Sequence, residues 1–196
     1  MIQPIDRPLV DAFSHVHDDA WRLLHDWEAP DATQEQLRRG YLDHLRAEPT
    51  GVAKAGPAAH LTASVLVFDP SLERVLLTHH RKAGAWLQLG GHLEPRDASV
   101  YAAACREVRE EAGLVGRDAV HVQPRIAQLD RHELAGAFGP CRVHLDIRFA
   151  GIAPTGADPV ASEESLAVRW WPVAALPEPS AAELTKLIAA CEDLLG

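Results

Sequence analysis

Apolar side chains recur at helical spacing in two segments near the start of the chain. Residues 8–28 predict one helix, which Pro30 bounds, and residues 33–47 predict a second, with Thr33 as its N-cap. Residues 48–57 hold glycine, proline and alanine and predict a linker. Two helices are marginal as a domain, so we expect them to dock on the following domain or on another subunit.

β-Rich runs separated by turn residues dominate the chain beyond the predicted linker. The first two runs, separated by Asp69, Pro70 and Ser71, predict an antiparallel hairpin. Residues 130–140 predict a loop, and an amphipathic helix with Ser180 as its N-cap is predicted over 180–195. The predicted strands are residues 60–68, 74–79, 120–129 (interrupted by Pro124), 143–149 and 166–173.

Between these strands lies a segment with a different pattern, residues 90–114. It opens with two glycines and an acidic loop, and continues as a helix that carries Glu107, Glu110 and Glu111 and stops at Gly113. Positions i, i+3 and i+4 share one face of a helix, so the three carboxylates point the same way and repel one another. A hard divalent cation relieves this repulsion, and Mg²⁺ or Mn²⁺ fits oxygen ligands best. The alternative interpretation is a solvated acidic helix face.

Composition narrows the class of protein. The chain has 196 residues, 47% of them hydrophobic, which is enough for one domain of about 140 residues and an extension. The net charge of -9 and the lack of a basic patch argue against a nucleic-acid-coating role. No signal peptide and no apolar run near 18 residues are evident, so we expect a cytoplasmic protein without a membrane span.

The three cysteines lie far apart in the sequence, without a CxxC spacing. Cys105, Cys141 and Cys191 therefore suggest neither a disulfide framework nor a zinc cluster. Three histidines of the first predicted helix, His15, His17 and His25, could bind a metal ion. Such residues more often face solvent or a partner.

The segment from Gly91 to Leu114 resembles the Nudix box. That pattern is Gly, five residues, Glu, seven residues, then Arg-Glu-apolar-any-Glu-Glu-any-Gly-apolar. The second half matches at every position from Arg106 to Leu114. In the first half Asp97 replaces Glu, and eight residues, not seven, separate it from Arg106.

The resemblance implies an α/β fold, a Nudix-type α/β/α sandwich with a mixed β-sheet, preceded here by an N-terminal helical extension. The implied boundaries are 1–57 for the extension and linker and 58–196 for the Nudix hydrolase domain. It also implies metal-dependent hydrolysis of a phosphoanhydride bond, most simply in a nucleoside diphosphate linked to another group. The expected partner is a small nucleotide-type substrate, with Mg²⁺ or Mn²⁺ as cofactor. A homodimer is plausible.

The same resemblance assigns roles within the site. Glu107, Glu110 and Glu111 bind metal, and the backbone carbonyl of Gly90 adds a ligand. Arg106, Asp97, Gly91 and Gly113 are structural, with Asp97 or Glu94 as the carboxylate that holds Arg106. The general base is a box glutamate or an acid on a later loop, where Glu164 and Glu163 are candidates.

The sequence defines the residues that contact a substrate less clearly than it defines the metal ligands. Arg81 and Lys82 precede the glycines and could meet substrate phosphates, or form an exposed hairpin tip. His144, Asp146 and Arg148 share one side of a strand, so they line a substrate cleft or form an outward polar face. Trp170 and Trp171 are expected in the core more than as stacking platforms for a base.

Two other functions remain open. One is a catalytically silent Nudix-fold module that binds or senses a ligand, although such proteins tend to lose box acids and all three are present here. The other is an isomerase of the same fold acting on a prenyl diphosphate, for which no cysteine is evidently placed.

Overall fold

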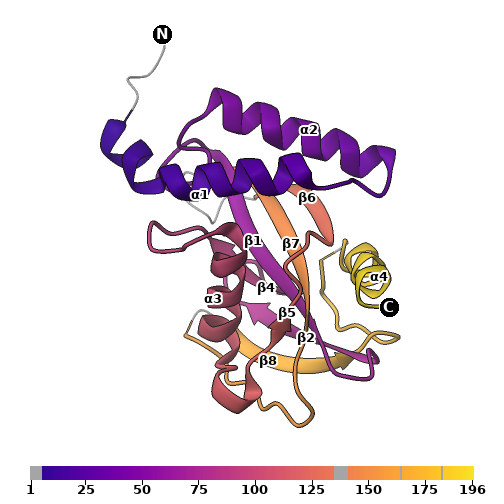
Figure 1. Cartoon of the computed structure of the whole chain (residues 1–196). Helices are drawn as coiled ribbons and strands as arrows, with labels where there is room; N and C mark the ends of the chain where they lie inside the picture. Colours follow the sequence, from indigo (N-terminus) through magenta and orange to yellow (C-terminus); the bar gives the residue numbers. More distant parts are fainter. Residues whose placement is uncertain (1–5, 135–140, 164, 182) are drawn as a thin grey trace. The chain divides into compact units, whose positions relative to one another are not determined.

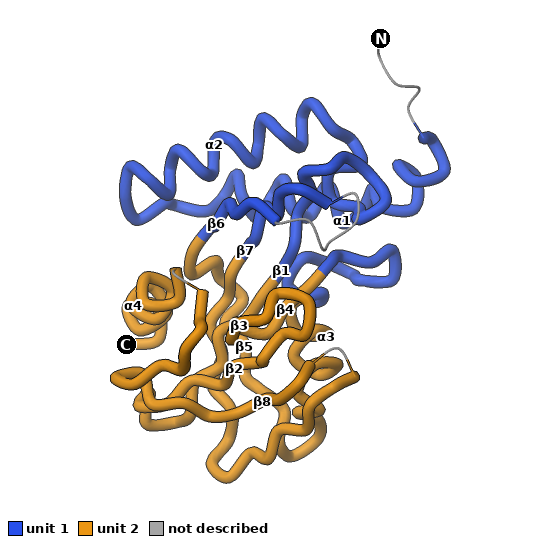
Figure 2. Tube along the Cα trace, turned by 180° about the vertical axis from the view of Figure 1, so that it is seen from behind, with its two compact units in different colours: residues 1–63, 92–103, 129–147 blue, residues 64–91, 104–128, 148–196 orange. Residues whose placement is uncertain are grey.

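The computed structural model describes residues 6–134, 141–163, 165–181 and 183–196. The chain divides into two compact units that interleave in sequence, coloured separately in Figure 2. Unit 1 holds residues 1–63, 92–103 and 129–147, and unit 2 holds residues 64–91, 104–128 and 148–196. Each unit therefore takes residues from the predicted domain 58–196, whose boundary with the extension stays a prediction.

Two helices form the N-terminal part of unit 1 (Figure 1). Helix α1 spans Arg7–Asp26, and the side chain of Asp6 accepts a hydrogen bond from the Leu9 amide at its start. Helix α2 spans Ala32–Ala47. Its N-cap is Asp31, which accepts from the Gln34 amide at 2.8 Å, so the prediction of Thr33 was wrong by two positions. The backbone of Asp31 is extended and lies just outside the helix, so its carboxylate can accept hydrogen bonds from the free amides of the first turn of α2.

The two helices are attached to the β-structure of unit 1 by polar contacts over long sequence separations. Gln34 makes a pair of hydrogen bonds with the backbone of Leu129, at 2.7 and 3.1 Å. The buried Tyr41 hydroxyl lies 2.6 Å from the carbonyl of Asp130 and 3.2 Å from that of Asp146. Since a buried hydroxyl needs such partners, these contacts fix α2 against this region.

The predicted linker is an ordered series of turns. The amides of Gly51, Ala53 and Gly56 each donate to a carbonyl three residues earlier, and the Gly51 carbonyl accepts from Leu61 at 2.8 Å. Val52 and Ala53 are fully buried. Residues 48–57 thus hold ordered turns between α2 and β1, and their role as a linker stays a prediction.

Among the described residues, eight strands form one sheet, with the hydrogen-bonded order β3-β2-β1-β7-β5. Off this path, β4 pairs with β1, β6 with β7 and β8 with β2. The strands are β1 (Ala59–Phe68), β2 (Arg74–His80), β3 (Ala85–Leu87), β4 (Leu89–His92), β5 (His121–Val122), β6 (Gln128–Glu133), β7 (Val143–Ile152) and β8 (Ser165–Pro172).

The pairing confirms the predicted hairpin, because β1 and β2 are antiparallel with Val67 opposite Leu76. Strand β8 lies antiparallel on the other side of β2, with Leu76 opposite Trp170. The predicted strand over 120–129 is two strands, since the segment with Pro124 separates β5 from β6. Strand β6 continues to Glu133, so part of the predicted loop over 130–140 is wrong; residues 135–140 lie outside the described residues.

The core of unit 2 lies between the sheet and helix α4 (Leu184–Leu195). Four α4 residues spaced at one face are buried against β1 and β2, and Trp171 packs on the same cluster. The helix begins at Leu184, so Ser180 is not its N-cap; Ser180 instead forms a parallel bridge with Trp86. The buried α4 residues are Leu184, Leu187, Ile188 and Cys191.

The predicted α/β class, with a mixed sheet and an N-terminal helical extension, is confirmed. Alternate residues of a strand face opposite sides of the sheet, so the burial of nearly every residue of β1 means that both faces of this strand are covered. In the described part of the chain, no helix has both the length and the apolar character needed to cross a bilayer.

Candidate active site

The box glutamates lie on helix α3, which spans Val100–Ala112. The Ser99 hydroxyl accepts from the Ala102 amide at 3.0 Å, and Asp19 of α1 accepts from the Val100 amide at 2.8 Å. Acidic groups at this end also complement the helix dipole. Gly113 follows the helix with a φ of +64°, a conformation that glycine adopts without strain.

Glu111 is held by the glycine strand that leads into the box. Its side chain is buried, with 6% exposed, and its Oε2 accepts a hydrogen bond from the Gly90 amide at 2.8 Å. A buried carboxylate without such a donor would be costly, so this bond fixes both the side chain and the strand β4 backbone beside it.

Glu107 lies against the neighbouring glycine. A Cβ atom built on Gly91 would lie 2.6 Å from Oε1 of Glu107, closer than atoms can approach. Glycine is therefore required here for close approach of the backbone to the carboxylate, independently of any turn geometry.

Arg106 connects two of the three glutamates. Its Nη1 lies 2.7 Å from Oε1 of Glu107 and 2.9 Å from Oε2 of Glu110. The Arg106 side chain is 8% exposed, whereas that of Glu110 is 47% exposed. One buried guanidinium thus offsets the repulsion between two carboxylates, a contact that the sequence reasoning did not foresee.

The donor set suits a hard cation, because three carboxylates and the Gly90–Gly91 backbone supply oxygens from one helix face and one strand. In the described residues these glutamates do not form a group of three converging ligand atoms. Arg106 occupies an oxygen of Glu107 and of Glu110, so a cation would replace or share these ion pairs.

The remaining box residue, Asp97, organises its own loop in unit 1. Its Oδ2 accepts from the Glu94 amide at 2.8 Å, and its carbonyl accepts from His15 Nε2 at 2.9 Å. Asp97 is buried, with 5% exposed, so its carboxylate depends on such donors. Its pairing with Arg106 stays a prediction.

The predicted general base on the later loop is not tested. Glu164 lies outside the described residues, and Glu163 is exposed just before β8. Arg81 and Lys82 lie exposed in the turn between β2 and β3, which fits the exposed hairpin tip and leaves phosphate binding a prediction.

The residues predicted on one side of β7 are not an outward polar face. Asp146 and Arg148 are each 3% exposed. Asp146 accepts from the Thr62 hydroxyl at 2.9 Å, and Arg148 donates to Gln128 at 2.8 Å. Burial, followed by the neighbouring His132 and His60, lowers the pKa of His144 to about 4. Contact between this side of β7 and a substrate stays a prediction.

Sequence reasoning missed two features in unit 1. Asp19 lies 81 residues before its partner Val100, so nothing local in the sequence announces this cap. His60, His92, Cys141 and His144 gather in one place, although the spacing of the cysteines in the sequence did not indicate a group of potential metal ligands. The histidines of α1 do not join them: His17 binds the Leu45 carbonyl at 3.0 Å, and His25 pairs with Asp26.

Comparison with solved structures identifies proteins of the same fold. A Caenorhabditis elegans Ap4A hydrolase (binary complex) has 17% identity and a TM-score of 0.58, over 69% of this chain and 96% of its own. The NUDIX domain of Shewanella oneidensis NrtR, complexed with ADP ribose, has 19% identity and a TM-score of 0.56, over 74% and 93%. The MutT protein from Methanosarcina mazei Go1 has 21% identity and a TM-score of 0.55, over 73% and 99%.

A comparison with curated proteins finds no match. The model of the NUDIX domain matches residues 58–191, which is well over half of the chain. It includes the whole of α3 and the glycine strand, so the site described above lies within the matched region. Together with the fold of its structural neighbours, this match shows that the chain belongs to the NUDIX domain family.

Proposed function

We propose that this protein hydrolyses a phosphoanhydride bond in a nucleoside diphosphate linked to another group, with Mg²⁺ or Mn²⁺ as cofactor. The observation that carries the proposal is the position of two carboxylates of α3 against the glycine strand, Glu111 at the Gly90 amide and Glu107 at Gly91. A solvated acidic helix face, the alternative interpretation, does not require a buried Glu111 or a glycine pressed against Glu107.

The cation would be held by Glu107, Glu110, Glu111 and the carbonyl of Gly90. When bound, it would neutralise the diphosphate oxygens and lower the pKa of a water molecule. Glu111 positions the glycine strand through the Gly90 amide, and Arg106 holds Glu107 and Glu110 at a fixed separation. These residues orient the carboxylates before the substrate arrives, which reduces the cost of reorganisation.

The general base belongs to a small set of acids. Glu110 is a candidate because its carboxylate is the most exposed of the three in the box. Glu164 and Glu163, on the loop before β8, are the others. Replacing the general base should reduce turnover and leave metal affinity unchanged, whereas replacing a metal ligand should reduce both.

The proposed substrate class is based on the net charge of the chain and on the names of similar solved structures. The chain carries a net charge of -9, so an anionic substrate requires a cation or a local basic group, for which Arg81 and Lys82 are candidates. One structural neighbour is named an Ap4A hydrolase and another is complexed with ADP ribose. These names concern those proteins, and they guide the choice of compounds to test here.

The test is chromatographic detection of the hydrolysis products, such as AMP from ADP-ribose and from Ap4A, over a panel of nucleotide derivatives with Mg²⁺ or Mn²⁺. We expect turnover that depends on the metal and falls at least about 100-fold in Glu110→Gln and Glu111→Gln. Asp193→Asn, at an exposed position of α4, is the control for replacing a carboxylate by an amide and should retain activity.

Turnover that survives both glutamate changes would refute the mechanism. Binding of a panel compound by the wild-type protein without any turnover would instead favour a silent ligand-binding module.

A further inference from the structure

Four potential metal ligands meet in unit 1, from three parts of the chain. His60 lies on β1, His92 ends β4, and Cys141 and His144 lie before and on β7. One ligand atom from each lies within 4.8 Å of all the others. The rings of His60, His92 and His144 are mutually close, with centroids 5.1 to 5.3 Å apart.

Hydrogen bonding prepares His60 to bind through Nε2. Its Nδ1 lies 3.0 Å from the carbonyl of Pro57, which can only accept, so Nδ1 carries the proton and Nε2 has the lone pair. A backbone carbonyl on the outer nitrogen is the arrangement that orients histidine ligands in metal sites.

Two of these histidines have a buried ring nitrogen without a protein partner. Nε2 of His60 and Nε2 of His144 are buried, and neither has a hydrogen-bond partner among the described residues. His60 is fully buried and Cys141 is 3% exposed. Leaving a buried polar atom without a hydrogen-bond partner destabilises a fold, so two in one place point to a ligand that the protein itself does not supply.

The types of ligand select the ion. Imidazole nitrogen and thiolate sulfur suit Zn²⁺, and hard ions such as Mg²⁺ and Ca²⁺ prefer oxygen, which this set lacks. Four ligands complete a tetrahedral site and leave no position for water, as in structural zinc sites. With metal–ligand distances of about 2.0–2.3 Å, ligand atoms lie roughly 3.3–3.8 Å apart, so the cluster would contract by about 1 Å.

We propose that His60, His92, Cys141 and His144 bind one Zn²⁺ ion that stabilises the fold of unit 1. The ion would join the ends of β1, β4 and β7, which are distant in sequence. His92 directly follows Gly91, so the same ion would anchor the chain at the point where it enters the Nudix box loop. This proposal does not depend on the proposed hydrolysis, because it uses none of the box carboxylates.

The test uses the full chain stripped with a chelator and then given one equivalent of Zn²⁺ or Co²⁺. We expect one tightly bound Zn²⁺ per chain by elemental analysis after desalting, and a melting temperature that rises on zinc addition. Bound Co²⁺ should give the intense visible bands of tetrahedral coordination and a near-ultraviolet thiolate charge-transfer band.

Matched variants identify the ligands. Cys141→Ser should abolish the thiolate band and weaken zinc binding by at least about tenfold, since even outer-shell changes cost 10–100-fold. Cys105 carries a thiol on α3 but is not among the four ligands, so Cys105→Ser should keep the thiolate band and the zinc affinity. His132→Gln should retain zinc, because the His132 ring packs edge-on against His144, with centroids 5.3 Å apart, but lies outside the ligand group. Glu111→Gln should also retain it, which separates this site from the box.

Three outcomes would overturn the proposal: less than about 0.1 zinc per wild-type chain, an octahedral Co²⁺ spectrum without a thiolate band, or unchanged affinity in Cys141→Ser. The wild-type spectrum decides the question even if a variant fails to fold. The four residues would then form a packed cluster without metal.

Discussion

Arg106 occupies a central position among the box side chains. A single nitrogen of this arginine contacts both Glu107 and Glu110, and the guanidinium is almost completely buried. A bound cation would therefore compete with Arg106 for the same carboxylate oxygens. The arginine serves as the internal counter-charge for carboxylates that otherwise repel one another.

Replacing Arg106 tests this role. Arg106→Gln should lower the free energy of unfolding by about 2 kcal/mol without metal, less than the roughly 3–5 kcal/mol of a fully buried pair, because Glu110 is exposed. Added Mg²⁺ should recover part of the loss, since it supplies the missing positive charge. Urea denaturation with and without Mg²⁺ measures both effects. Arg109→Gln, on the exposed side of α3, is the control, and an equal loss in both variants would contradict the account.

Replacing Gly91 by alanine tests the close approach between strand β4 and the carboxylate of Glu107. In Gly91→Ala the new methyl group would meet Oε1 of Glu107, so the carboxylate must move away from the site. We expect turnover to fall roughly 100-fold, the typical cost of a displacement of about 1 Å. The loss of stability should be small, because the displaced atom ends a flexible side chain.

The matched control for this change is Gly40→Ala on α2, where a Cβ atom meets nothing within 4 Å. This variant should gain about 0.5–1 kcal/mol of stability and keep its activity. Full activity in Gly91→Ala would show that Glu107 does not need its present position.

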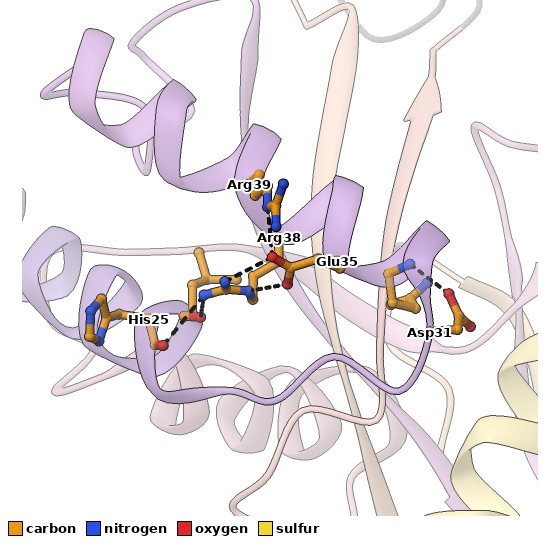
Figure 3. A network of polar contacts seen from close by, with 7 residues as sticks. His25, Asp31, Glu35, Arg38 and Arg39 are labelled. Atoms are coloured by element: carbon orange, nitrogen blue, oxygen red, sulfur yellow. Dashed lines mark hydrogen bonds and ion pairs between the residues drawn. The ribbon is translucent and has the colours of Figure 1, made fainter.

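At the scale of elements, the N-terminal helices are joined by a charged network within unit 1 (Figure 3). Glu35 accepts from Arg38 at 2.7 and 3.1 Å and from Arg39 at 2.7 Å. Arg38 also donates to the carbonyls of Leu24 and His25 at the end of α1, at 3.3 and 3.4 Å. A cation at these carbonyls satisfies the acceptors that a helix terminus leaves open.

This network predicts a pH dependence of stability. Hydrogen bonds from Arg38, then from Arg39, lower the pKa of Glu35 from 4.5 to about 2. A lowered carboxylate pKa gives stabilisation that is complete above about 4.5 and is lost as the pH falls towards 2. Glu35→Gln should therefore melt below wild type at pH 7, and the gap should narrow below pH 4.5.

Melting temperatures between pH 7 and pH 3 measure this gap. The exposed Glu28→Gln is the control and should follow the wild-type profile. A gap for Glu35→Gln that stays constant down to pH 3 would show that the carboxylate charge is not the source of the effect.

The elements that the sequence predicted best are those with strong local periodicity. Helix α1, the β1–β2 hairpin and α3 follow patterns that each segment carries by itself. The errors lie where contacts between residues distant in the sequence determine the local structure. Asp31, not Thr33, caps α2, and β6 extends into a segment that was predicted as a loop. The Nudix box indicated the acidic face of α3, but not Arg106 as its counter-charge, because an ion pair depends on which rotamers meet.

At the scale of the whole molecule, the compact units do not follow the sequence boundary. Unit 1 combines the N-terminal helices with the box loop and with parts of β1, β6 and β7. The proposed zinc site likewise draws on segments more than 80 residues apart, from His60 to His144, and no local pattern in the sequence predicts that they meet. The oligomeric state and the identity of the substrate stay predictions for the same reason.

Removal of residues 1–57 tests this organisation. The truncated chain would lose the contacts of Gln34 and Tyr41 with the unit 1 strands, together with the apolar residues buried on α1 and α2. We expect a less cooperative thermal transition by circular dichroism and increased binding of a hydrophobic dye. Tyr41→Phe, which removes only the hydroxyl, should cost about 1 kcal/mol. A truncated chain that melts like the full one would contradict the assignment.

The central claim is that the box carboxylates of α3 bind a divalent cation. The most direct measurement is a titration of the protein with Mn²⁺, followed by electron paramagnetic resonance, for wild type, Glu111→Gln, Glu110→Gln and the control Asp193→Asn. The account predicts that wild type and control bind Mn²⁺ equally and that both glutamate variants bind at least about tenfold more weakly. Equal Mn²⁺ affinity in all four proteins would contradict it.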